Sequence, residues 1–291
     1  MKFLSYSHGG HASFGVAVTD GPEPGVIDLG EALDGVRDLS DLLAQRRVDE
    51  ARAAASGRTP TIPLDSITYE PTLPHPGKIF CIGVNYGGRN AEYRPDEGAA
   101  TTVARPSVFV RFPSSFTGHE QPLVRPPESD QLDYEGEIVA VIGTGGRRIA
   151  TDVARQHIAG LTLGNEGTIR DWVRHAKFNV TQGKNWDRSG SIGPWMVTLD
   201  EIGDFEDLHL TTHVNDELRQ DDTPATMAYP IEEQVAYLST FCTLEPGDII
   251  FTGTPTGAGA RFDPPRFLVP GDTVEVRVPE IGTLRNGVRD E

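Results

Sequence analysis

The sequence has few of the residues that build disulfide frameworks, zinc clusters or nucleic-acid surfaces. Only two cysteines, Cys81 and Cys242, occur in 291 residues, so neither a disulfide framework nor a zinc cluster is implied. Basic residues number 26 against 43 acidic ones, and the net charge of -17 argues against nucleic acid or an anionic membrane as partner. No apolar run reaches transmembrane length and the first residues do not resemble a signal peptide, so we expect a cytoplasmic protein.

Several signatures of nucleotide and hydrolase chemistry are also missing. Gly183-Lys184 lacks the earlier glycine and the following Ser or Thr of a phosphate-binding loop, and no G-x-G-x-x-G follows a predicted strand. There is no H-E-x-x-H and no G-x-S-x-G in the chain. A dinucleotide fold, a zinc protease and a Ser-His-Asp hydrolase therefore have no local support.

The pattern of turns and short apolar runs predicts a mixed α/β, β-rich fold. The 32 glycines and 22 prolines separate these runs, as is typical of many short strands. Helices are expected over 39–55, starting at Asp38 or Ser40, and over 231–241. Prolines between residues 60 and 76 mark an extended connection. We place a boundary near residue 72, with a small β-plus-helix domain before it and the main domain over 73–291.

The central stretch at 133–142 carries the strongest chemical signal. Residues 138–142 are apolar and predict a buried strand. Because strand side chains alternate between faces, Glu135 and Glu137 lie on one face, and Gly136 leaves the other face open to a neighbouring backbone. Two buried carboxylates repel each other, so a hard cation such as Mg²⁺, Mn²⁺ or Ca²⁺ would stabilise them. Taken alone, the pair is better explained by an edge strand whose glutamates face water, because an E-x-E in a strand is common.

Further polar residues follow other predicted strands. Glu166 could supply a third carboxylate, and Asp171 could hold Arg170 or a neighbouring loop. Lys184 could stabilise a negative charge beside a metal, and Thr254 lies in a turn rich in hydroxyl and N–H groups. Each residue alone has an ordinary explanation, such as a surface ion pair, a solvated lysine or a simple turn.

Together these segments identify a family. From about Lys78 to Leu284 the chain resembles the fumarylacetoacetate hydrolase family, and the residues before it resemble that family's N-terminal domain. The matching segments occur in order: D-Y-E-G-E at 133–137, G-N-E-G-T-I-R-D-W at 164–172, G-K-N at 183–185, G-P-W-M-V-T at 193–198, P-G-D-I-I-F-T-G-T-P at 246–255 and G-T-L-R-N at 282–286.

The resemblance implies a fumarylacetoacetate hydrolase-like β-roll catalytic domain, a homodimer, and Mg²⁺ or Mn²⁺ held by three carboxylates. Glu135 and Glu137 match the first two metal ligands. Glu166 matches the third, where the family commonly has aspartate, so its extra methylene gives the ligand a longer reach.

The resemblance also implies roles for several basic and hydroxyl residues. Lys184 matches the lysine that stabilises the enolate of the substrate, and Thr254 matches a residue that binds a substrate carboxylate. Arg111 lies in a strand where relatives often have a basic residue, and Arg170 is a further candidate for substrate binding.

Two departures from the family pattern bear on the reaction. Relatives often read N-Y-x-x-H-x-x-E, where a histidine and a glutamate activate water; this chain keeps Glu92 but has Arg89 at the histidine position. Arginine stays protonated and cannot act as a general base. A frequent glutamine is replaced by Val173. Glu92, or a histidine such as His119 or His175, would then have to move protons.

The sequence thus predicts a metal-dependent enzyme with Glu92, Lys184 and Arg89 as catalytic candidates. Hydrolysis of a C–C bond in a fumarylacetoacetate-like or acylpyruvate-like 2-oxo acid is the first expectation. Decarboxylation or isomerisation of a related acid is the alternative, since these reactions need only metal chelation and a stabilised enolate. A relative that binds metal or ligand without catalysis is the remaining alternative.

Overall fold

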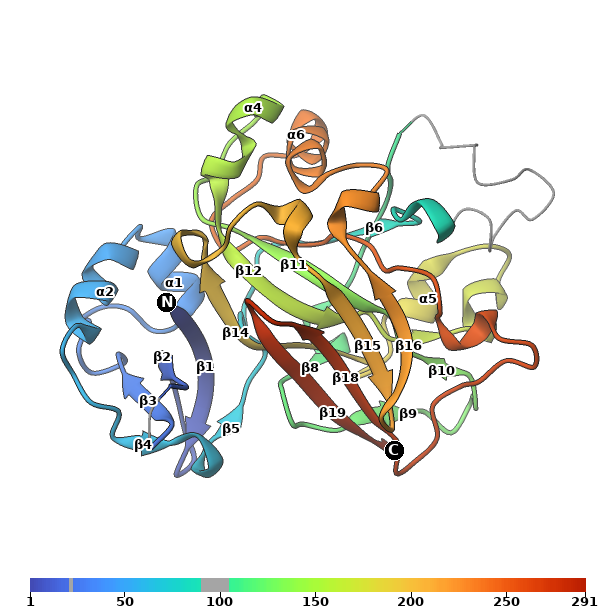
Figure 1. Ribbon diagram of the computed structural model, residues 1–291, viewed down its shortest axis with the longest axis horizontal. Helices are drawn as coiled ribbons and strands as arrows, with labels where there is room; N and C mark the ends of the chain where they lie inside the picture. Colours follow the sequence, from blue (N-terminus) through green and yellow to red (C-terminus); the bar gives the residue numbers. More distant parts are fainter. Residues whose placement is uncertain (21–22, 90–104) are drawn as a thin grey trace.

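Two β-sheets packed face to face form the main body of the computed structural model, which describes residues 1–20, 23–89 and 105–291 (Figure 1). Within these residues the larger sheet runs in the order β4-β3-β2-β1-β14-β12-β11-β17-β6-β7, with β5 paired to β1 and β8 to β14. Its strands are β1 (Lys2–His8), β2 (His11–Val18), β3 (Gly25–Asp28), β4 (Ile62–Pro63), β5 (Thr68–Tyr69), β6 (Ile79–Gly83), β7 (Ser107–Val110), β8 (Phe116–Thr117), β11 (Gly136–Ile142), β12 (Ile158–Asn165), β14 (Gly190–Thr198) and β17 (Ile249–Phe251).

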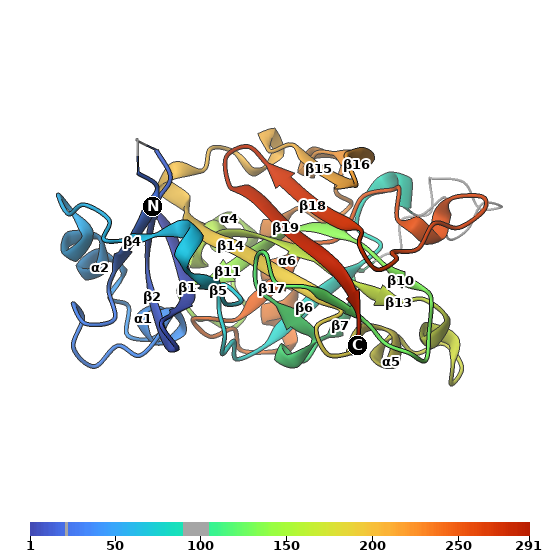
Figure 2. The same cartoon turned by 90° about the horizontal axis from the view of Figure 1, so that it is seen from below.

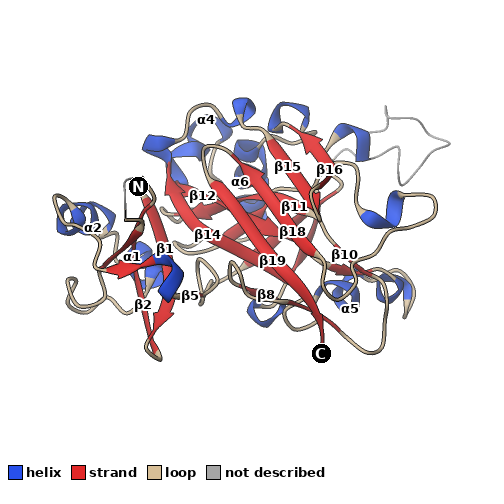
Figure 3. Ribbon diagram, turned by 60° about the horizontal axis from the view of Figure 1, so that its bottom comes forward, coloured by secondary structure: helices blue, strands red, loops and turns tan. Residues whose placement is uncertain are grey.

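The smaller sheet lies across β11, β12 and β14, as Figure 3 shows. Its order is β16-β15-β18-β19-β9, with strands β9 (Leu123–Arg125), β15 (Leu210–Val214), β16 (Glu217–Asp222), β18 (Thr273–Val278) and β19 (Gly282–Asp290). A separate short pair joins β10 (Leu132–Asp133) to β13 (Thr168–Ile169). The sheet-rich, mixed fold that the sequence predicted is confirmed.

Strand β11 shows how alternation divides the core. Ile138 and Ala140 belong to the cluster that contains residues of the smaller sheet and of α6 (Ile231–Phe241). Val139 belongs to the cluster on the opposite face. Gly136 faces the smaller sheet, where an added Cβ would lie 2.0 Å from the Thr212 hydroxyl oxygen. The close approach that the glycine predicted is therefore present, and the neighbouring acidic side chains are directed to the other face.

The first 72 residues extend the larger sheet. Strand β1 pairs with β14, and Phe3 and Phe14 share one hydrophobic cluster with Val139 and Phe251. Figure 2 shows these strands beside β14. The boundary near residue 72 stays an interpretation of the sequence.

The first predicted helix is divided in two. Residues 39–55 form two helices, α1 (Leu39–Ala44) and α2 (Val48–Ala55), instead of one. Between them Arg46 has a left-handed φ of 56°, which ends the helical path. The predicted cap is present, because the Asp38 side chain accepts a hydrogen bond from the Asp41 amide at 2.8 Å. Residues 151–157 divide into α4 (Thr151–Ala154) and a 3₁₀ turn.

Helix α6 agrees with the prediction in both bounds and orientation. Its buried residues Ile231, Val235 and Leu238 repeat at helical spacing and face the core. No helix in the described part of the chain is both long enough and apolar enough to cross a membrane.

Candidate metal centre

Three glutamates meet at the ends of β11 and β12. Strand β11 begins at Gly136, so Glu135 lies just before the strand and not within it as expected. The register pairs Gly136 with Asn165, the last residue of β12, and the Glu166 amide donates to the Glu135 carbonyl at 2.8 Å. This pairing brings Glu135, Glu137 and Glu166 together, with one carboxylate oxygen from each within 4.8 Å of the others. All three are buried.

The side chain of Glu135 is surrounded by cations. Its Oε1 accepts hydrogen bonds from Arg89 at 2.6 Å and from Arg170 at 2.7 Å, while Lys184 donates to Oε2. Thr168 adds a longer contact to Oε2, at 3.4 Å. Burial by itself would raise the pKa of Glu135, but Arg170, Lys184 and Arg89 together hold it well below its usual range.

The other two carboxylates have much less compensation. Glu137 accepts a hydrogen bond from the Gly253 amide at 2.7 Å, and burial together with the charges of Glu166 and Glu135 raises its pKa well above the usual range. Glu166 is 3.1 Å from the Lys184 ammonium, yet its Oε1 is buried without a hydrogen-bond partner.

These features fit a divalent metal. The donor set consists only of carboxylate oxygens, which Mg²⁺ and Mn²⁺ prefer. An orphaned oxygen on Glu166 and a carboxylate of raised pKa on Glu137 both call for a cation between them. The identity of the ion and the ligand roles remain predictions.

Lys184 reaches this cluster from a short helix, α5 (Val180–Lys184), which begins at the side-chain cap of Asn179. The preceding residue, Gly183, packs so closely that an added Cβ would lie 2.4 Å from a Val173 methyl carbon. The glycine thus allows α5 to approach the turn after β13 and brings Lys184 inward. Burial disfavours the charged ammonium, but Glu135 and Glu166 raise the pKa of Lys184 above its usual value.

Thr254 is bound within the protein. Its hydroxyl donates to the Gly136 carbonyl at 2.9 Å and accepts from the Gln220 side chain at 2.8 Å. Gln220 in turn accepts a hydrogen bond from the Gly136 amide at 2.9 Å. The threonine therefore lies next to the strand of metal candidates. The binding of a substrate carboxylate by Thr254 stays a prediction.

Arg111 is fully enclosed near the third carboxylate. It donates to Ser115, to the Gly167 carbonyl and to Ser189, each at 3.1 Å, and lies 3.8 Å from Glu166. Its guanidinium stacks on Phe116, 4.3 Å from the ring centroid. These contacts make it well placed to position Glu166, while direct contact with substrate stays a prediction.

Other expected proton carriers lie elsewhere or are not described. Glu92 lies outside the described residues. His119 accepts a hydrogen bond from the Arg285 amide at 3.0 Å and packs on Tyr69; burial lowers its pKa to about 4. His175 is exposed and stacks on Trp172. Among the described residues, neither histidine has a contact with the three glutamates.

Sequence reasoning missed the residues that hold the site together. Asp133 binds Arg170 at 2.7 Å and also accepts from the amides of Gly259 and Ala260. Its place at the start of D-Y-E-G-E was the available signal. Asp171, offered as the partner of Arg170 or of a neighbouring loop, accepts from Ser129 in such a loop at 2.6 Å. The segment 165–175 contains β13 and a 3₁₀ helix, Asp171–Arg174.

Comparison with known proteins gives a consistent result. The family model "Fumarylacetoacetate (FAA) hydrolase C-terminal" matches residues 78–289. The oxaloacetate tautomerase YisK of Bacillus subtilis is 40% identical over 229 residues, which are 77% of this chain and 74% of that protein. The mitochondrial oxaloacetate tautomerase Fahd2a of Rattus norvegicus is 36% identical over 239 residues, 82% of this chain and 74% of the relative. A fumarylacetoacetate hydrolase from the psychrophilic Exiguobacterium antarcticum superposes with a TM-score of 0.79 at 30% identity, over all of both chains.

Proposed function

The chain belongs to the fumarylacetoacetate hydrolase family, and we propose that it is a divalent-metal-dependent tautomerase of a 2-oxo dicarboxylic acid such as oxaloacetate. The observation that carries this proposal is the charge balance around the three glutamates. Among the described residues, four carboxylates and four cations lie in this cluster: Asp133, Glu135, Glu137, Glu166, Arg89, Arg111, Arg170 and Lys184. The charges of these side chains cancel, so a bound divalent ion would leave the cluster with two positive charges, which the two negative charges of a dicarboxylate would neutralise.

Arg89, which stands where relatives often have a histidine, favours tautomerisation over hydrolysis. Arg89 is 1% exposed and binds Glu135, so its guanidinium serves as a fixed charge. Hydrolysis needs a base that activates water, whereas tautomerisation needs a proton moved at one carbon and a stabilised enolate. The relatives with the name oxaloacetate tautomerase support the same class.

The candidate site residues have separate proposed roles in this reaction. A divalent ion held by Glu135, Glu137 and Glu166 would act as a Lewis acid on the 2-oxo group. Lys184 adds positive charge where the enolate oxygen develops. Thr254 and Arg170 orient the substrate carboxylates. Glu92 remains the sequence-based candidate for moving the proton.

The first test is a reaction panel with purified protein. We expect the protein to convert the enol form of oxaloacetate to the keto form in the presence of Mg²⁺ or Mn²⁺, and to lose this activity in EDTA. The reaction is monitored by the absorbance of the enol. Acetylpyruvate and fumarylpyruvate test the hydrolysis that the sequence put first, and release of CO₂ tests decarboxylation. Metal-dependent cleavage of an acylpyruvate without tautomerisation would replace the proposal. Metal binding without turnover of any compound would favour a non-catalytic relative.

The charge of Arg89 should select for the second carboxylate of the substrate. For Arg89→Gln we expect kcat/KM with oxaloacetate to fall about tenfold, because a buried charge-assisted interaction is worth about 1.5–3 kcal/mol. Deuterium exchange at C3, followed by NMR, allows comparison with the monocarboxylate 2-oxobutanoate. In Arg89→Gln the kcat/KM for 2-oxobutanoate should fall less than that for oxaloacetate, because 2-oxobutanoate lacks the second negative charge.

The matched control for Arg89→Gln is Arg174→Gln, because Arg174 is exposed and stacks on Phe178. It should behave as the unchanged protein. Equal losses for the dicarboxylate and the monocarboxylate would show that Arg89 acts only by supporting Glu135.

A homodimer, implied by the family resemblance, is also part of the proposal and is tested by light scattering.

A further inference from the structure

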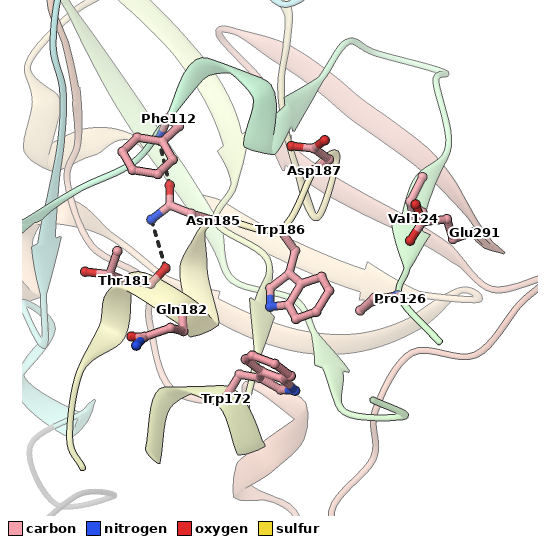
Figure 4. Close-up of a pocket in the computed structure, with 10 residues that line it drawn as sticks. All are labelled: Phe112, Val124, Pro126, Trp172, Thr181, Gln182, Asn185, Trp186, Asp187 and Glu291. Atoms are coloured by element: carbon pink, nitrogen blue, oxygen red, sulfur yellow. Dashed lines mark hydrogen bonds between the residues drawn. The ribbon is translucent and has the colours of Figure 1, made fainter. Parts of the chain in front are cut away.

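A pocket of about 500 Å³ lies beside α5, and none of the residues that line it takes part in the metal centre (Figure 4). Lys184 at the end of α5 points to the glutamates, while Gln182 and Asn185 line the pocket. Pockets of this size hold small organic ligands. The same helix therefore separates two possible binding sites.

Aromatic rings form much of the wall. Trp172 and Trp186 meet edge to face, with their ring centroids 4.8 Å apart. His175 stacks in parallel on Trp172 at 4.0 Å, so Trp172 already contacts two rings. Figure 4 shows the Trp186 indole in the middle of the labelled residues, above Trp172. Indole faces carry the negative side of the ring quadrupole and attract cations.

The polar groups of the pocket are mainly acceptors. The carboxylates of Asp187 and Glu291 line it, and none of the ten lining residues is basic. The Gln182 side-chain oxygen is buried and has no hydrogen-bond partner. Asn185 is already occupied, since it accepts from the Phe112 amide at 2.7 Å and donates to the Thr181 carbonyl at 3.0 Å. None of these lining residues offers a counter-charge to an anion, whereas Asp187 and Glu291 offer two carboxylates to a cation.

We propose that this pocket binds a small organic ammonium ion with an apolar body. The apolar part packs on the face of Trp186 and on Phe112, and the ammonium group faces the carboxylate of Asp187. An inorganic cation would leave the aromatic wall unused. The site does not depend on the reaction proposed above, because its lining residues and the three glutamates are separate sets.

The test is calorimetric titration of the metal-free, full-length protein with benzylammonium chloride and with benzyl alcohol at neutral pH. The two probes share the ring and differ in charge. We expect 1:1 binding of benzylammonium with a Kd on the order of 1 mM, as suits a ligand of this size. Benzyl alcohol should bind about tenfold more weakly, because it lacks the cation.

Two variants locate the site. Asp187→Asn and Trp186→Leu should each raise the Kd for benzylammonium about three- to tenfold, by loss of charge and of the aromatic face. Asp187 is exposed, so its variant is expected to fold even if the tryptophan variant does not. The controls are Asp65→Asn and Phe241→Leu, at exposed positions of other elements. Equal binding of the two probes, no saturable binding, or a Kd unchanged by Asp187→Asn would overturn the proposal.

Discussion

Replacing Glu137 by glutamine is expected to abolish metal binding and turnover together. Glu137 is buried, and within the described part of the chain it accepts a hydrogen bond from the Gly253 amide alone. Burial and its acidic neighbours raise its pKa. A divalent ion is what would keep it ionised. Because Lewis-acid stabilisation is worth several kcal/mol, kcat should fall by about 10³ or more.

The measurements are Mn²⁺ binding by calorimetry and the oxaloacetate assay, each with the same preparation. The control is Glu233→Gln on α6, where the glutamate is exposed and distant in sequence from the cluster. Retention of full turnover by Glu137→Gln after EDTA treatment would contradict the proposed metal centre.

The same substitution should stabilise the metal-free fold. A buried carboxylate beside Glu135 and Glu166 is costly when it is ionised, and glutamine has the same shape without the charge. We therefore expect the Tm of metal-free Glu137→Gln to exceed that of the metal-free parent at pH 7, and the order to reverse when Mn²⁺ is added. A lower Tm of the metal-free variant would contradict the expectation that the Glu137 carboxylate destabilises the metal-free fold.

Replacing Lys184 by methionine is expected to lower turnover strongly but leave metal binding intact. The ammonium lies 3.1 Å from Glu166 and also donates to Glu135, so it is fixed beside the metal candidates. Loss of one pre-positioned donor to a developing oxyanion commonly lowers kcat by about 10²–10³. Metal affinity should stay the same or rise, because a competing positive charge is removed.

Arg89 and Arg170 still bind Glu135 in this variant, so one carboxylate keeps its partners and the fold should persist. Circular dichroism and the Tm test that expectation. The control is Lys177→Met, because Lys177 is exposed. Loss of Mn²⁺ binding in Lys184→Met would show that the lysine supports the metal ligands; turnover near that of the parent would remove it from the chemistry.

The sequence alone determined the features that depend on local pattern. Alternation along a strand has a period of two, so Glu137 and the apolar residues of β11 could be assigned to faces without a structure. Gly136 between two acidic residues signalled a close approach on the opposite face, and Thr212 makes that approach. The ordered motifs also fixed the family, because several separated segments had to match at once.

Only the tertiary structure decided how distant segments combine. The register of β11 against β12 sets Glu166 beside Glu135, and pairing register is not encoded in either strand alone. The gathering of Arg89, Arg170 and Lys184 on one carboxylate depends on three separate segments: the residues after β6, the turn after β13 and the end of helix α5. The role of Asp133 as partner of Arg170 follows from the pairing of β10 with β13. Charges act through space, so the charge balance on which the proposed substrate class rests appears only after folding.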